Sequence, residues 1–162
     1  MIDNLEIKIA TINDLPQIQQ LAKQVMSDCY RSYLGDKMVD WFIESGGIDE
    51  ELAANLENCS ILCNKQEGIG FSLIQQHTIQ LIMVATHFQR KGYGSLLLNH
   101  CESILSKQKY HTIQVETFRN NTQATSFFKK NGWEIIYESE KDIFGFVRVL
   151  LEKQIHQLTP PS

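Results

Sequence analysis

The sequence predicts an α/β domain of the α+β type, in which helices flank one sheet. Three short runs rich in apolar and β-branched residues, at 59–64, 68–75 and 79–84, follow one another with few residues between them. Because these connections are too short for a crossover helix, the three runs are predicted to pair as an antiparallel meander. Apolar residues at helical spacing before and after the meander predict the flanking helices.

The N-terminal part is predicted to form one strand and one amphipathic helix. Leu5, Ile7 and Ile9 alternate with polar residues, which is typical of a half-buried strand. Residues 11–14 are predicted to cap the following helix, which tolerates Pro16 in its first turn. The apolar stripe of this helix consists of Leu15, Ile18, Leu21, Ala22, Val25 and Met26.

Residues 28–48 are rich in aromatic side chains and are predicted to form a short helix with flanking loops. Within this segment, Trp41 and Phe42 are expected to pack in the core, because large aromatic side chains are mostly buried. A second short helix over 49–56 is predicted to lead into the meander.

The elements after the meander alternate between helix and strand. A long helix begins at the glycines of residues 92–94, a strand follows at 111–118, and residues 133–139 and 144–151 are predicted to form a hairpin. The last residues, 157–162, are expected to be a frayed tail, which leaves a single domain over residues 1–156.

The composition supports one globular domain and argues against several classes of partner. The chain has 162 residues, of which 43% are hydrophobic and 21% are charged. Its net charge of -4 predicts neither a nucleic-acid nor a membrane partner, since both require a basic surface. The same charge mildly favours a cationic substrate such as an amine.

The four cysteines are predicted to be reduced thiols in a cytoplasmic protein. Cys59 and Cys63 are four residues apart, but no Cys or His cluster completes a metal site, so no metal is expected. The N-terminal residues include acidic side chains and no long apolar run, so we expect neither a signal peptide nor a membrane span.

The residues between the central strand and the long helix are predicted to bind an anion. The apolar strand ends near Val84, and the run Gln-Arg-Lys-Gly-Tyr-Gly occupies residues 89–94. The two glycines leave the main chain accessible, and the first turn of the helix presents N–H groups at the positive end of the helix dipole. Arg90 and Lys91 add positive charge, so the turn suits a phosphate or pyrophosphate.

Several interpretations of this turn compete. A Walker-type loop requires a Lys-Ser/Thr pair after its last glycine, whereas Ser95 and Leu96 follow here. A dinucleotide-binding loop requires a small residue three positions after its second glycine, and Leu97 occupies that position. The glycines could also serve only to make a tight turn into the helix.

A second motif decides between these interpretations. Gln-x-x-Gly-x-Gly at a strand-to-helix junction resembles the pyrophosphate-binding motif of the Gcn5-related N-acetyltransferases. Residues 121–133, NTQATSFFKKNGW, resemble the same family's downstream pattern Asn-x-x-Ala-x-x-Phe-Tyr-x-x-x-Gly-Phe at every spacing. In physical terms, this motif is a short helix that ends at Asn131-Gly132.

The resemblance covers nearly the whole chain and implies the acyl-CoA N-acyltransferase fold, with a mixed, mostly antiparallel central sheet, splayed central strands and flanking helices. It implies acetyl-CoA as cosubstrate, with the pantetheine arm between the splayed strands and the pyrophosphate at residues 89–95. The residues that it assigns to the cofactor are Ile82, Met83, Val84, Gln89, Arg90, Lys91, Gly92, Tyr93, Gly94, Ser95, Asn121 and Phe128.

Glu116 is the candidate catalytic residue. Its position twelve residues before Phe128 resembles the spacing of the Glu and Tyr that act as base and acid in bacterial acetyltransferases of ribosomal-protein N-termini. An ordinary solvated Glu on a strand explains Glu116 equally simply. Other branches place a Glu early in the central strand, where this chain has Thr78, and His77 next to it is a further titratable candidate.

Phe128 departs from the family pattern, which often has Tyr at this position. Phenylalanine cannot protonate the departing thiolate, but a thiol pKa of about 8.5 makes the thiolate a tolerable leaving group. The sequence therefore predicts an N-acetyltransferase that acts on a primary amine of a small molecule or peptide by direct attack in a ternary complex. A non-catalytic acyl-CoA-binding or sensing module is the alternative, and a homodimer is left open.

Overall fold

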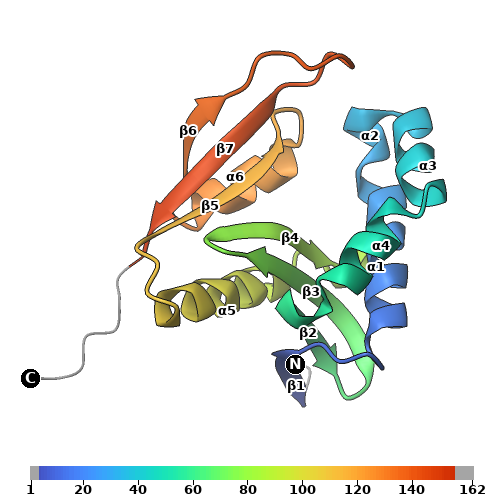
Figure 1. Ribbon diagram of the computed structural model, residues 1–162, viewed down its shortest axis with the longest axis vertical. Coiled ribbons are helices and arrows are strands. Elements are labelled where there is room, and N and C mark those ends of the chain that lie inside the picture. Colours follow the sequence, from blue (N-terminus) through green and yellow to red (C-terminus); the bar gives the residue numbers. More distant parts are fainter. Residues whose placement is uncertain (1–3, 156–162) are drawn as a thin grey trace, which may run out of the picture. The chain divides into compact units, whose positions relative to one another are not determined.

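The computed structural model describes residues 4–155, so the expected tail at 157–162 lies outside the described residues. The backbone groups into two compact units, whose helices and strands are labelled in Figure 1. The first unit runs to Ile74 and takes up Leu81–His100. The second holds Gln75–Gln80 and the chain from Cys101 onward. The expectation of one domain over residues 1–156 stays a prediction.

The first unit contains most of the helices and the meander. Its strands are β1 (Leu5–Ile9), β2 (Cys59–Asn64), β3 (Glu67–Gln75) and the end of β4 (Thr78–Val84). Its helices are α1 (Leu15–Cys29), α2 (Arg31–Leu34), α3 (Asp36–Glu44), α4 (Gly47–Ala54), the short 3-10 helices η1 (Leu56–Asn58) and η2 (Thr86–Phe88), and the first part of α5 (Tyr93–Lys107).

Helix α1 forms as the apolar stripe predicted, and its buried side chains are Ile18, Leu21, Ala22, Val25 and Met26. The prediction that side chains of residues 11–14 cap the N-terminus of α1 is wrong. The Asp14 carboxylate accepts hydrogen bonds from the backbone N–H and the hydroxyl of Thr11, at 2.8 and 3.1 Å. It makes no side-chain bond to the first turn of the helix.

The prediction for residues 28–48 is wrong, because this segment is mostly helical. Gly35, with φ of 85°, separates α2 from α3, and Gly46, with φ of 77°, separates α3 from α4. The predicted burial of Trp41 is also wrong, because its side chain is 62% exposed. Val39 is the buried residue of α3, and a residue two positions further along a helix points to the opposite side.

The three strands of the meander are neighbours in the sheet, as predicted, and β1 adds to the outer side of β2. β1 is antiparallel to β2, with Ile7 opposite Leu62, and β2 is antiparallel to β3. A two-residue turn with Gln76 at φ of 53° then connects β3 to β4, its neighbour in the sheet. The core under these strands consists of Leu62, Ile69 and Leu97, all fully buried, with Ile7, Ile82, Val84, Phe88 and Tyr93 packed against it.

The second unit combines the start of β4 with β5 (Thr112–Phe118), α6 (Thr122–Lys130), β6 (Glu134–Glu138) and β7 (Arg148–Gln154). Thr78 and Ile79 pair in parallel with Gln114 and Val115, whereas β7 is antiparallel to both β5 and β6. The complete order is β1-β2-β3-β4-β5-β7-β6. The predicted mixed, mostly antiparallel sheet with flanking helices is therefore confirmed.

The C-terminal hairpin differs from the prediction at the start of its second strand. β7 begins at Arg148, whereas the sequence indicated residue 144. Asp142 explains the difference, since its carboxylate accepts hydrogen bonds from the N–H groups of Phe144 and Phe146, both at 2.9 Å. These bonds hold a turn and leave the Phe144 side chain 64% exposed in the loop.

Gly70 on β3 allows the close approach of β4 and α5. A Cβ atom at this position would lie 2.6 Å from the carbonyl oxygen of Met83 and 2.8 Å from Cδ1 of Leu97. Neither neighbour can move without disturbing a buried strand or the core cluster. Any side chain at position 70 would therefore displace the strand that leads into the turn at residues 89–94.

We predict that Gly70→Ala lowers the free energy of unfolding by about 1–3 kcal/mol, the usual range for overpacking a core. Urea denaturation monitored by circular dichroism measures the change. Gly47→Ala is the matched control, because its Cβ would meet only Oγ of Ser45, at 3.5 Å, and it should be neutral or stabilising. Equal stability of Gly70→Ala and the wild type would contradict the packing argument.

Candidate functional site

The turn that follows β4 has the geometry of an anion-binding loop. After η2, Arg90 and Gly92 both adopt positive φ angles, of 62° and 89°, and α5 begins at Tyr93. The N–H of Leu96 donates to the carbonyl of Gly92 at 3.2 Å. The N–H groups of the preceding residues, Tyr93 to Ser95, come before the first bond of the helical ladder and can serve a ligand.

The charges of this turn face solvent. Arg90, Lys91 and Gly92 are exposed, and Nζ of Lys91 lies 6.0 Å from the centroid of the Phe88 ring. Two cations next to the positive end of the α5 dipole make this part of the surface attractive to a diphosphate. The sequence therefore predicted correctly that these residues lie together at a strand-to-helix junction.

Gln89 holds the turn in place through its side chain. Its Nε2 donates to the carbonyl of Val84 at 2.9 Å and lies 3.6 Å from Sγ of Cys29 on α1. The amide therefore joins the end of β4 and the end of α1 to the turn. The sequence suggested only that Gln89 belongs to a cofactor motif, whereas the structure indicates that its side chain shapes the loop.

A second hydrogen bond joins α1 to the residues before the turn, and the sequence did not predict it. The hydroxyl of Thr86 in η2 donates to the carboxylate of Asp28 at 2.7 Å, and Gln24 donates to the other oxygen at 3.0 Å. The hydrogen bond from Thr86, followed by that from Gln24, lowers the pKa of Asp28 below its ordinary value of 3.8. Asp28 and Thr86 are 58 positions apart, so no local pattern could reveal this pair.

An open cavity of about 580 Å³ lies between α1 and η2 in the first unit. Gln17, Gln24 and Asp28 contribute from α1, and Thr86 and His87 contribute from η2. Gln17 and Gln24 are seven positions apart, and Gln24 and Asp28 are four positions apart, so all three side chains lie on one face of the helix. The cavity thus lies beside the chain that leads into the anion-binding turn.

Two phenols lie near the C-terminal end of α1. The rings of Tyr30 and Tyr33 are 5.5 Å apart, centroid to centroid. Burial, with a smaller contribution from Cys29, raises the pKa of Tyr30 to about 12, and burial also raises the pKa of Tyr33. Both phenols are therefore neutral near pH 7, where they can donate protons in hydrogen bonds but cannot act as bases.

The four cysteines are thiols that form no disulfide, as predicted. Cys59, Cys63 and Cys101 are buried, and Cys29 is partly exposed. Burial raises the pKa of Cys59 to about 11 and raises that of Cys63 as well, which leaves both as unreactive thiols. In the described residues, no three His, Cys, Asp or Glu side chains are grouped so that they could hold a metal ion.

Asn121 lies at the N-terminus of α6 in the second unit. Its side-chain oxygen accepts a hydrogen bond from the N–H of Ala124 at 3.2 Å, and its Nδ2 donates to Oγ1 of Thr117 at 3.3 Å. The first bond caps α6, and the second ties the helix to β5. At the other end, Gly132 has a φ of 90° and follows Asn131, as the predicted stop requires.

Phe128 is a core residue of the second unit. Its side chain is 3% exposed, and its ring contacts those of Phe127 and Trp133, with centroids 5.2 and 5.3 Å apart. The assignment of Phe128 to the cofactor therefore stays a prediction, and its packing role is clear from the structure.

Glu116 is exposed on β5 and forms an ion pair. Its Oε1 accepts a hydrogen bond from Nη1 of Arg148 at 3.2 Å, and the guanidinium of Arg148 lies 4.7 Å from the centroid of the Phe118 ring. The carboxylate is accessible to solvent, as a general base must be before substrate binds. The arginine partner, which comes from the neighbouring strand β7, was not identified from the sequence.

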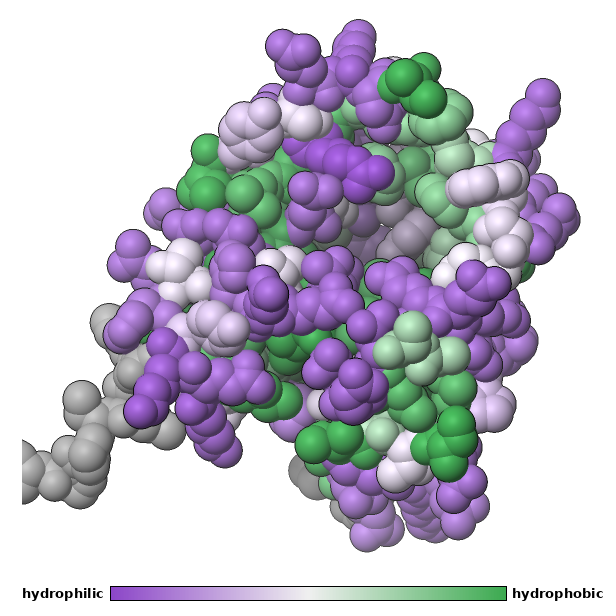
Figure 2. Space-filling model, in the orientation of Figure 1, coloured by the Kyte–Doolittle hydropathy of each residue, from purple (hydrophilic) through white to green (hydrophobic). Residues whose placement is uncertain are grey.

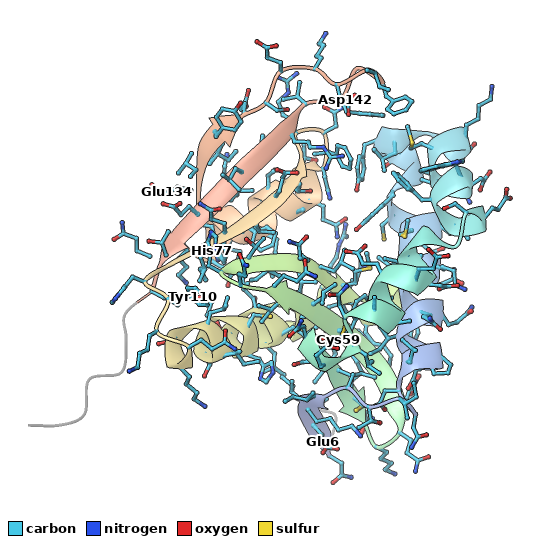
Figure 3. The ribbon with its side chains drawn as sticks, in the orientation of Figure 1. Glu6, Cys59, His77, Tyr110, Glu134 and Asp142 are labelled. Atoms are coloured by element: carbon cyan, nitrogen blue, oxygen red, sulfur yellow. The ribbon has the colours of Figure 1, made fainter. Side chains whose placement is uncertain are left out.

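His77 belongs to a polar chain within the second unit. Its Nε2 lies 3.2 Å from Oε1 of Gln114, and Nε2 of Gln114 donates to Glu152 at 2.9 Å. Because Gln114 donates to Glu152, its oxygen accepts from His77, so Nε2 of His77 carries the proton. Figure 3 shows His77 beside Tyr110, and their ring centroids are 6.1 Å apart.

Comparison with known proteins identifies the family. The model of the acetyltransferase (GNAT) family matches residues 23–133. The chain therefore belongs to the GNAT acetyltransferase family, as its two motifs predicted. The match includes the anion-binding turn, Glu116, Asn121 and Phe128.

Solved structures show the same fold. The PaiA N-acetyltransferase from Thermoplasma acidophilum, in complex with coenzyme A, has a TM-score of 0.78 and 20% identity, with 93% of this chain and 99% of that chain covered. A GCN5-related N-acetyltransferase from Rhodopseudomonas palustris has a TM-score of 0.81 and 12% identity, with 96% and 98% covered. A ribosomal-protein alanine N-acetyltransferase from Escherichia coli has a TM-score of 0.70 and 16% identity, with 96% of both chains covered. The predicted acyl-CoA N-acyltransferase fold is thus confirmed.

The link between Asp28 and Thr86 yields a prediction about pH. Thr86→Val removes the hydroxyl at nearly constant volume, so the pKa of Asp28 should rise toward 3.8. In the wild type, the depressed pKa contributes stability that is present above pH 3.8 and is lost as pH falls through the folded-state pKa. The variant should lose part of that contribution.

A carbon-detected NMR titration of the Asp28 carboxyl group measures the shift. An unchanged pKa in Thr86→Val would show that the hydrogen bond does not control this carboxylate. Asp36→Asn, which removes an exposed carboxylate that pairs with Arg31, is a control that should leave the pKa of Asp28 unchanged.

Proposed function

We propose that the chain is an N-acetyltransferase that transfers the acetyl group of acetyl-CoA to a primary amine of a small molecule or peptide. The observation that carries this proposal is the turn at residues 89–95, where two cations and the first N–H groups of α5 meet at the end of β4. Membership of the acetyltransferase family and the coenzyme A complex of the Thermoplasma acidophilum structure support it.

The pyrophosphate of the donor is proposed to bind at the turn. The N–H groups of Tyr93, Gly94 and Ser95 would donate to its oxygens, and Arg90 and Lys91 would balance its charge. Main-chain groups of Ile82, Met83 and Val84 are the proposed partners of the pantetheine arm. The assignments of Asn121 and Phe128 to the donor rest on the family resemblance alone.

The proposed reaction is direct transfer in a ternary complex. A primary ammonium with a pKa of about 10.4 is neutral in only about one molecule in a thousand near pH 7.4, so its proton must first be removed. The amine nitrogen then forms a bond to the thioester carbonyl carbon, and the carbon–sulfur bond breaks. The thiolate takes up one proton, so the products are the acetylated amine and CoA with a free thiol.

Glu116 is the proposed acceptor of the amine proton, directly or through water. Its exposure on β5 supports this role, and its ion pair with Arg148 competes with it. Because both side chains of the pair are about half exposed, a cationic amine could displace the arginine at small cost.

Phe128 supports a second candidate function, a non-catalytic acyl-CoA-binding module. Without a hydroxyl at this position, the thiolate would be protonated by water or by another group, so the chain could bind acyl-CoA without efficient turnover. A panel of amines incubated with acetyl-CoA, with release of the free CoA thiol as readout, separates the two functions. Thiol release that depends on one class of amine supports the enzyme, whereas CoA binding without any release supports the binding module.

The cytoplasm is the proposed location, because cysteines that form no disulfide suit a reducing compartment. In the part of the chain that the structure describes, no helix has the length and apolar character needed to cross a membrane.

The donor site can be tested with glycine substitutions in the turn. We expect Gly92→Val and Gly94→Val to weaken CoA binding several-fold to a hundredfold, roughly 1–3 kcal/mol. Gly92 has a φ of 89°, and a Cβ atom there would meet nothing within 4 Å, so the loss would come from backbone strain and not from a clash. Isothermal calorimetry with CoA measures the affinity. Gly46→Val, which places the same strain in the α3–α4 turn, is the control, and equal affinity in all variants would refute the assignment.

The proposed base can be tested with a pair of substitutions. Glu116→Gln should lower kcat/KM about a hundredfold, most strongly at low pH, while CoA affinity is unchanged. Arg148→Gln removes the partner but keeps the carboxylate, so it should retain most of the activity. If Glu116→Gln has the rate and pH profile of the wild type, or if both variants lose activity equally, Glu116 is not the base.

A further inference from the structure

The outer edge of β1 has backbone groups that can pair with another strand. Among the strands of residues 4–155, β1 lies at one end of the sheet, next to β2. The N–H of Ala10 donates to Cys59 on the β2 side, and the carbonyl of Asn4 accepts from Lys65 on the same side. Since backbone directions alternate along a strand, the even-numbered residues bond to β2, and Leu5, Ile7 and Ile9 direct their N–H and C=O groups outward.

The side chains of β1 form a pattern that is complementary to itself. The strand reads Leu-Glu-Ile-Lys-Ile, with Ile7 at its centre. If a second copy paired antiparallel about Ile7, Glu6 of each copy would lie opposite Lys8 of the other. Leu5 would lie opposite Ile9, and the two Ile7 residues would lie opposite each other. Every cross-strand pair would then be either apolar or oppositely charged.

The backbone and the charges select the same register. Pairing about Ile7 places Leu5, Ile7 and Ile9 opposite outward-directed residues of the other copy, which allows about six N–H···O=C bonds. A register centred on Glu6 or on Lys8 would place like charges opposite each other. A shift by one residue would match outward-directed backbone groups with groups that already bond to β2.

The exposure of β1 also favours such pairing. The side chains of Leu5 and Ile9 are 39% and 65% exposed, whereas Ile7 packs against the core cluster of the first unit. Apolar side chains are visible among polar ones in the lower part of Figure 2, and Figure 3 shows Glu6 at the periphery of the first unit. A second β1 would cover exposed apolar surface that a single copy leaves in water.

We propose that β1 is a dimerisation strand, through which two copies of this chain pair antiparallel about Ile7 and continue one sheet into the other. The contact is isologous, because the same strand serves both copies, and it closes with two-fold symmetry. It does not use residues 89–95, so it is independent of the proposed function. A five-residue strand makes a small interface, and we expect a dissociation constant of about 10–100 µM.

Charge reversal provides a direct test. Glu6→Lys places two lysines opposite each other across the pair, and Lys8→Glu places two glutamates opposite each other, so each variant should dimerise roughly tenfold more weakly. The double variant Glu6→Lys/Lys8→Glu restores opposite charges and should recover the wild-type constant. Sedimentation velocity over a range from about 5 to about 500 µM measures the masses, and circular dichroism melts establish that each variant is folded.

Mixing the two single variants shows whether Glu6 and Lys8 act by pairing across the dimer or only by stabilising each copy. An equimolar mixture of Glu6→Lys and Lys8→Glu should form a heterodimer, because each lysine then faces a glutamate. Ile9→Pro removes an outward-directed N–H without affecting the bonds to β2, and it should abolish the dimer. A monomer throughout the concentration range, single variants as dimeric as the wild type, or no heterodimer in the mixture would overturn the proposal.

Discussion

The close contact between β3, β4 and α5 is the constraint on which the turn at residues 89–95 depends. At Gly70 the backbone of β4 and the side chain of Leu97 approach to distances that a Cβ atom would not permit. Leu97 belongs to the first turns of α5, and Met83 precedes the end of β4 by one residue. The strand and the helix on the two sides of the turn are therefore held against the same small residue. This contact positions the N–H groups at the start of α5 relative to the end of β4.

Helix α1 stabilises the turn from a second direction. Asp28 binds Thr86, and Cys29 contacts Gln89, so the last turn of α1 reaches residues on both sides of Phe88 in the sequence. A turn that is shaped in advance loses less conformational entropy when a ligand binds. The positive φ angle of Arg90 agrees with this, since the strained backbone of a non-glycine residue persists where the surrounding structure holds it.

The residues proposed for the donor and the proposed base belong to different units of the chain. The first contains the turn proposed for the donor, and the second contains the carboxylate and the capped helix that the resemblance associates with transfer. Asn121 shows how one residue can carry a structural and a proposed functional role, since its side chain caps α6 and contacts β5. The edge strand β1 uses none of these residues and presents a surface suited to a second copy of the chain.

The sequence by itself determined the elements that depend on neighbours along the chain. Alternation predicted β1, helical periodicity predicted the buried face of α1, and two motifs identified the family and predicted the strand-to-helix turn and the helix α6. Only the tertiary structure decided features that depend on distant residues. The exposure of Trp41, the need for glycine at position 70, the pair of Asp28 with Thr86 and the partner of Glu116 all arise from contacts between separate elements. Local periodicity reports which face of a segment is apolar, but burial and pairing are decided by what the rest of the chain places against that face.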